Sequence, residues 1–249
     1  MKGLLRTAIQ FFVTFFIFWW IFQDIDLIQV GNIYRNANPW WISAGILILI
    51  ISLIMGGLQW FVLLRAQGVS ISATKTLKLY WIALFFTNFL PGSLGGDIVR
   101  IYSLARYERC GKEGFAATVI DRFAGLFAMV IFSIFASIYL LFINRETLNE
   151  TSHYVVRTVF FVFCVFIFMI FVLFSQRTFR IIFDVILGGL QDILLVQKVR
   201  DLHTYFHIYR KKSSLLFKVG IISMAIQFLR IIVHLCAACA LGVSLKYFI

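Results

Sequence analysis

A chain of 249 residues that is 61% hydrophobic and only 14% charged carries more apolar surface than a water-soluble domain can bury. The composition therefore predicts an all-α, polytopic membrane protein, and a content of two prolines suits long helices. A formal charge of +12 would suit nucleic acid in a soluble protein. Here the basic residues are concentrated in a few loops, so we expect no nucleic-acid partner.

The N-terminal quarter contains two apolar runs of membrane-spanning length. Lys2 and Arg6 precede the first run, residues 7–22, and no small-residue cleavage pattern follows it, so we expect an uncleaved span rather than a signal peptide. A loop is expected over residues 23–38. Trp40 then marks the interfacial start of a second span that ends near Arg65.

Residues 77–96, with the sequence LKLYWIALFFTNFLPGSLGG, predict a re-entrant hairpin. The apolar helix before Pro91 has about fourteen residues, so at 1.5 Å per residue it reaches roughly 21 Å, short of a hydrocarbon core of roughly 30 Å. Three glycines follow the proline: Gly92, Gly95 and Gly96. Broken backbone at membrane depth must be packed in protein or line a polar cavity, so we expect the tip inside the membrane.

The remainder of the chain predicts further spans and two surface helices. Asp97 occupies the position expected for the N-cap of an amphipathic surface helix over residues 97–112. Further spans are predicted over residues 114–143, 154–174 and 213–242, and a second amphipathic segment over 178–210. The sequence thus predicts five full spans plus the hairpin.

The distribution of basic residues indicates the orientation. With a cytoplasmic N-terminus, and with residues 77–96 returning to the side from which they enter, most of the 23 lysines and arginines lie in cytoplasmic loops. A crossing at 77–96 would place the basic segment 100–112 outside. The charges therefore favour the hairpin and predict a multi-pass plasma-membrane protein with a cytoplasmic N-terminus.

Ionisable residues in apolar segments are candidate functional residues, because a charge inside a membrane is costly. In chain order they are Asp97, Arg100, Asp121, Arg122 and Arg230. The free backbone N–H groups of residues 92–96, at the start of a helix, would add an anion-binding nest. This combination predicts binding of a membrane lipid with an anionic head group.

Structural roles for the same residues stay open at this point. Asp97 would serve as a helix cap, Asp121 and Arg122 would pair with Arg100, Asp97 or Arg65 to fix the hairpin, and the glycines would permit close helix packing. The sequence contains no HExxH motif, no serine nucleophile elbow and no convincing pair of catalytic carboxylates. We therefore expect no enzymatic activity, no metal and no cofactor.

Three motifs carry a resemblance to a known family: LLRAQGVSIS, FLPGSLGGDIVRIYSLAR and AATVIDRFAGL, in that order. Together they resemble the transmembrane region of lysylphosphatidylglycerol synthases, a family of flippase-like membrane proteins. The resemblance implies a membrane domain that moves or handles lipids. Its site residues would be Arg65, Pro91, Gly95, Gly96, Asp97, Arg100, Asp121 and Arg122. A soluble synthase domain follows in bifunctional members and is not expected here, so lysyl transfer is not predicted.

Two functions are compatible with these features. The first is a lipid translocase, or lipid-handling protein, for a lipid with an anionic or phosphate-linked head group. The alternative is a non-transporting membrane subunit that presents a lipid-linked substrate to a glycosyltransferase or lipid synthase.

A short repeat bears on the domain organisation. Gly-Val-Ser followed by an apolar residue occurs at 68–71 and at 242–245, at the ends of two long helices that would face opposite sides of the membrane. Units of opposite orientation indicate an inverted repeat. We therefore expect residues 1–249 to form a single membrane domain, with one repeat unit and the start of a second, truncated at its C-terminal end.

Overall fold

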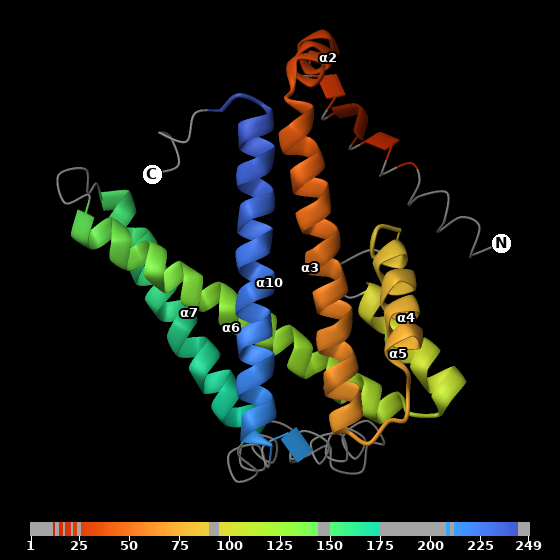
Figure 1. The fold of residues 1–249 in the computed structure, drawn as a ribbon. Coiled ribbons are helices and arrows are strands. Elements are labelled where there is room, and N and C mark those ends of the chain that lie inside the picture. Colours follow the sequence, from red (N-terminus) through yellow and green to blue (C-terminus); the bar gives the residue numbers. More distant parts are fainter. Residues whose placement is uncertain are drawn as a thin grey trace. The chain divides into compact units, whose positions relative to one another are not determined.

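The computed structural model describes residues 12, 15–16, 18–20, 22–23, 26–89, 95–143, 150–174, 208–209 and 212–243. Within these ranges the regular structure is helical, without strands, which confirms the all-α prediction (Figure 1). The helices are α2 (Leu27–Asn36), α3 (Pro39–Ala66), α4 (Ala73–Thr87), α5 (Gly95–Glu108), α6 (Gly111–Ile143), α7 (Glu150–Phe174) and α10 (Ser213–Ala240).

Four of the described helices, α3, α6, α7 and α10, contain segments long and apolar enough to cross a membrane. They correspond to four of the five predicted spans. The predicted first span, residues 7–22, and the predicted amphipathic segment 178–210 lie for the most part outside the described residues. The total number of spans therefore stays a prediction.

The helices fall into two compact units, one formed by residues 1–47 with 232–249 and the other by residues 48–231. In the first unit the backbone N–H of Asn38 donates to the carbonyl of Ala240 at 2.9 Å. This unit also contains α2, where we had expected only a loop. Asp26 starts α2, because its Oδ1 accepts the backbone N–H of Ile28 at 2.9 Å.

In the second unit, α4 begins one turn earlier than the sequence predicted. The Ser72 side chain accepts the backbone N–H of Lys75 at 3.2 Å and so caps the helix before its apolar run begins. The loop between α3 and α4 packs into the core. Val69 and Ile71 are buried together with Trp60 and Leu63. This loop therefore anchors α4 to the end of α3.

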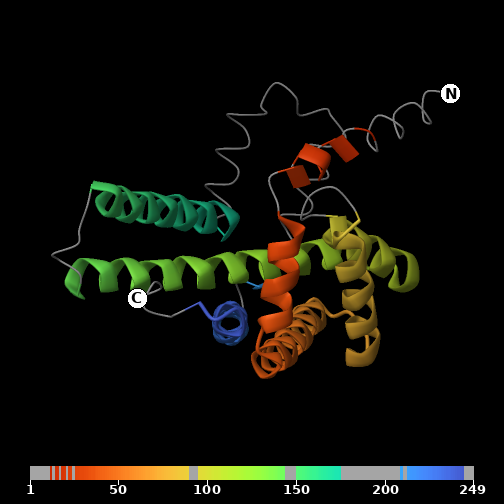
Figure 2. The same ribbon diagram turned by 90° about the horizontal axis from the view of Figure 1, so that it is seen from above.

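Helices α4 and α5 lie side by side in Figures 1 and 2, and they contact each other through a very close approach. A Cβ atom at Gly96 would lie 2.0 Å from the Thr87 Oγ1 and 2.5 Å from the Ala83 carbonyl oxygen. Gly56 and Gly57 on α3 make room for side chains of α4, because added Cβ atoms would lie 2.5 Å from the Tyr80 hydroxyl and the Leu77 Cδ2. Small residues thus bring α3, α4 and α5 together.

Helix α5 starts at Gly95, so the prediction that Asp97 is its N-cap is wrong. Asp97 lies in the first turn instead, with its carboxylate engaged by arginine side chains. Arg109 ends the helix in a left-handed conformation with φ of 59°, and α6 begins at Gly111. A Cβ at Gly114 would lie 2.6 Å from the Leu104 side chain, so α5 also packs closely on α6.

Helices α6 and α7 pack against each other (Figure 2). Their contact is aromatic: the Phe166 ring centroid lies 6.0 Å from that of Phe123 and 6.2 Å from that of Phe127. Offset contacts of this kind are favourable between aromatic rings.

The close approach at Gly96 gives a first prediction. Gly96→Ala should lower stability by about 1–3 kcal/mol, because the added methyl group overpacks the α4–α5 contact. The measurement is thermal unfolding of the purified protein in detergent. Adding Thr87→Ala to Gly96→Ala removes the nearer obstacle, the Thr87 hydroxyl. It should not restore stability, because the Ala83 carbonyl belongs to the backbone and stays in place.

Gly220→Ala is the matched control. An added Cβ there meets nothing within 4 Å, and alanine favours a helix by up to about 1 kcal/mol over glycine. Equal melting temperatures for Gly96→Ala and Gly220→Ala would contradict the close packing.

Candidate functional site

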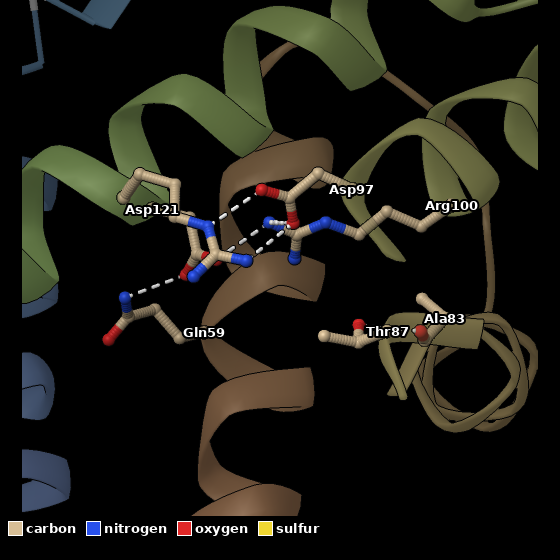
Figure 3. A network of polar contacts seen from close by, with 7 residues as sticks. Gln59, Ala83, Thr87, Asp97, Arg100 and Asp121 are labelled. Atoms are coloured by element: carbon tan, nitrogen blue, oxygen red, sulfur yellow. Dashed lines mark hydrogen bonds and ion pairs between the residues drawn. The ribbon is translucent and has the colours of Figure 1, made fainter. Parts of the chain in front are cut away.

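The candidate site is built around two aspartates and two arginines on α5 and α6. Asp97 and Arg100 are three residues apart on α5 and therefore share one helix face, while Asp121 and Arg122 are adjacent on α6. These side chains converge across the α5–α6 contact, as Figure 3 shows for the three that it labels. Four charges that are dispersed in the sequence thus form one cluster.

Arg100 is the most buried member, with 2% of its side chain exposed. Its Nη2 atom lies 3.0 Å from Asp97 Oδ1 and 3.0 Å from Asp121 Oδ2 (Figure 3). The guanidinium carbon also lies 5.0 Å from the Trp60 ring centroid and 5.7 Å from that of Tyr80, within the range of cation–π attraction. The Nε atom has no hydrogen-bond partner among the described residues. Two carboxylates and two aromatic rings therefore hold this charge in place.

Asp97 and Arg122 form a two-point ion pair. Arg122 Nε donates to Asp97 Oδ2 at 2.7 Å, and Arg122 Nη2 donates to Oδ1 at 2.8 Å. Paired contacts of this kind fix the plane of the guanidinium as well as its position. The Arg122 side chain is nevertheless 52% exposed, and its Nη1 atom takes no part in the pair. One edge of the Arg122 guanidinium is thus fixed, while about half of the side chain is exposed.

Neutral polar residues extend the cluster to α3 and α10. Ser223 Oγ donates to Gln59 Oε1 at 2.9 Å, and Gln59 Nε2 donates to Asp121 Oδ1 at 2.9 Å (Figure 3). Gln227 Nε2 donates to the carbonyl of Gly125 at 3.3 Å on the same side of α10. The network therefore links α3, α5, α6 and α10 by directed contacts.

These residues line a cavity with a volume of about 290 Å³. Its charged lining residues are Asp97, Arg100, Asp121, Arg122 and Arg230. Within the described part of the chain Arg230 makes no hydrogen bond or ion pair, and its residue is exposed. Three guanidinium groups against two carboxylates leave the cavity with one excess positive charge, and both carboxylates are already paired.

The structure brings most of the sequence candidates to this cavity. Gly96 lines it from the first turn of α5, next to Gly95. Arg65 is exposed in the last turn of α3 and does not line the cavity. Pro91 and Gly92 lie outside the described residues, so the predicted anion nest at 92–96 stays a prediction.

Sequence reasoning missed several lining residues. Gln59, Tyr80, Thr87 and Ser223 all contribute to the cavity. They are uncharged, so the cost of burying a charge, which marked the other candidates, does not single them out. Asp121 pairs with Arg100, and Arg122 pairs with Asp97. These ion pairs match the structural alternative that the sequence had left open.

The described residues contain no group of three or more histidine, cysteine, aspartate or glutamate side chains that could hold a metal ion. What the arrangement offers is a polar cavity with accessible guanidinium groups, suited to binding an anion.

The fold and the site define a helical membrane protein with a polar, positively charged cavity among its helices. The chain belongs to the family described as the lysylphosphatidylglycerol synthase TM region, whose profile matches residues 7–248. This confirms the family resemblance carried by the three motifs.

Two curated relatives, both described as UPF0104 membrane protein, come from Methanothermobacter thermautotrophicus. One is 25% identical over 108 residues, which are 43% of this chain and 32% of the relative. The other is 26% identical over 115 residues, or 45% of this chain and 33% of the relative. The chain thus covers about a third of the length of these relatives. No solved structure matches the chain significantly.

The buried ion pairs give a second prediction. Asp97→Asn removes the carboxylate charge that Arg122 and Arg100 share. Because Arg100 keeps Asp121 and Arg122 is half exposed, we expect a loss of about 1.5–3 kcal/mol, below the range for a fully buried pair. Thermal unfolding in detergent should therefore show a large drop in melting temperature.

Glu108→Gln on the same helix is the control. Glu108 pairs with Lys75 near the surface, where an ion pair contributes at most about 1 kcal/mol. If both variants melted at the same temperature as the parent protein, the cluster would not support the fold.

Proposed function

We propose that this protein handles membrane lipids with an anionic, phosphate-containing head group and moves that head group across the bilayer. The observation that carries the proposal is the excess positive charge of the cavity. Residues of α3, α6 and α10 line this cavity, and all three helices are long and apolar enough to span a membrane. A charge in a membrane is costly and marks a functional site by default. The family description names a lipid synthase region, which supports a lipid-related role.

The proposed path uses α4 and α5 as the two arms of a re-entrant hairpin. In this proposal α5 is the returning arm, and not the surface helix that we expected over residues 97–112. Helix α4 has 15 residues, so it is roughly 22 Å long and does not reach across a core of roughly 30 Å. Lys75 and Lys78 near its start are consistent with entry from the cytoplasmic side of the plasma membrane, with a cytoplasmic N-terminus. The hairpin would then bring Gly96 and Asp97 to membrane depth beside the cavity.

A second cavity suits the apolar part of the same lipid. It has a volume of about 390 Å³ and is lined by aromatic and aliphatic side chains of α6, α7 and α10, among them Phe123, Phe127 and Phe217. Helices α6 and α10 line both cavities with different faces. In our proposal the head group occupies the polar cavity while an acyl or prenyl chain lies against the apolar one.

A proteoliposome assay tests the proposal and gives a third prediction. The purified chain should move fluorescent phosphatidylglycerol between leaflets, which is measured as the fraction of label protected from an external quencher. Arg122→Gln should slow this transport about tenfold or more, because a charge-assisted contact to phosphate contributes about 1.5–3 kcal/mol.

Arg106→Gln is the matched control, since Arg106 is exposed near the end of α5 and does not line the cavity. Binding without transport would favour the alternative of a subunit that presents lipid to a glycosyltransferase or synthase. Equal transport by the Arg122 and Arg106 variants would place the site elsewhere. Neither role requires catalysis by this chain.

A further inference from the structure

We infer that the lipid bound in this cavity carries a phosphate and no cationic group, so that aminoacylated lipids such as lysylphosphatidylglycerol are excluded. This inference rests on the proposed function and narrows its substrate class. It follows from which charges of the cavity are already paired and which remain accessible.

The carboxylates of the cavity are not accessible to a ligand cation. Asp97 accepts Arg122 on both oxygens and also contacts Arg100. Asp121 accepts Gln59 on Oδ1 and Arg100 on Oδ2. Each carboxylate oxygen therefore already has a donor, and the two side chains are only 9% and 14% exposed. An ammonium group on a ligand would have to compete with the arginines or with Gln59 for these oxygens.

The accessible charges are all positive. Arg122 keeps its Nη1 atom clear of the pair with Asp97, and half of its side chain is exposed. Arg230 lines the same cavity and, among the described residues, contacts no carboxylate. Two guanidinium groups that line the cavity therefore keep donors for an anion, and the planar fork of a guanidinium suits a phosphate.

A lysyl ester would add two ammonium groups to such a head group. Both would face a cavity with an excess positive charge and without a free counter-ion in the described residues. Like charges at short range repel each other and so disfavour binding. We expect the affinity for lysylphosphatidylglycerol to be at least tenfold below that for phosphatidylglycerol.

The test is a competition experiment on the full chain in detergent micelles. Unlabelled phosphatidylglycerol or lysylphosphatidylglycerol displaces a fluorescent phosphatidylglycerol. The quantity measured is the midpoint concentration of lysylphosphatidylglycerol divided by that of phosphatidylglycerol. Arg230→Glu changes the cavity from one excess positive to one excess negative charge, so it should lower this ratio at least tenfold. Arg230 has no partner in the described residues, so the variant should melt like the parent protein.

Lys218→Glu is the matched control. It makes the same charge change on α10 at an exposed position that does not line the cavity, and it should leave the ratio unchanged. An equal shift in both variants would reflect the general charge of the protein and would overturn the inference.

The remaining outcomes distinguish failure of the inference from failure of the proposed function. If lysylphosphatidylglycerol displaced the probe as well as phosphatidylglycerol did, with Arg122→Gln weakening both, the inference would be overturned and the proposed function would stand. If neither lipid competed for a saturable site, the proposed function would fail, and the inference with it.

Discussion

The guanidinium of Arg100 lies between the carboxylates of Asp97 and Asp121, and the packing of four helices depends on this contact. Removing a charge from water costs several kcal/mol or more, so Arg100 is tolerable at 2% exposure only while both carboxylates are present. The aspartates in turn require Arg122 and Gln59. These residues come from α3, α5 and α6, and Ser223 from α10 donates to Gln59. None of these four helices can therefore shift without breaking a contact of the cluster.

Close helix approach places the cluster. Between helices in lipid there is little hydrophobic driving force, so association depends on packing and on small residues. The first turn of α5 reaches α4 only because Gly96 has no side chain, and α4 reaches α3 at Gly56 and Gly57. These contacts fix α5 so that Asp97 and Arg100 face α6. The glycines and the charges of this region are therefore parts of one arrangement.

The sequence predicted the helical class and four residues of the cluster, because Asp97, Arg100, Asp121 and Arg122 stand out against apolar surroundings. It missed Gln59 and Ser223, whose role arises only from the hydrogen bond between them, which joins α3 to α10. It also placed the start of α4 one turn late, since the Ser72 cap is a local contact that hydropathy does not register. Arg65 was a candidate by motif alone, and its exposed position away from the cavity depends on helix rotation, which the motif does not contain.

The three arginines of the cavity differ in what a ligand can reach. Arg100 is enclosed by carboxylates and aromatic rings, so a ligand that displaced its partners would leave two buried aspartates uncompensated. Arg122 differs, because Asp97 binds its Nε and Nη2 atoms while Nη1 lies outside the pair and the side chain is half exposed. An anion can bind there without breaking the ion pair, and the pair already fixes the orientation of the guanidinium. A donor fixed before binding loses little freedom when the ligand arrives. Arg100 thus supports the fold, and Asp97, which contacts both arginines, positions Arg122 in the cavity.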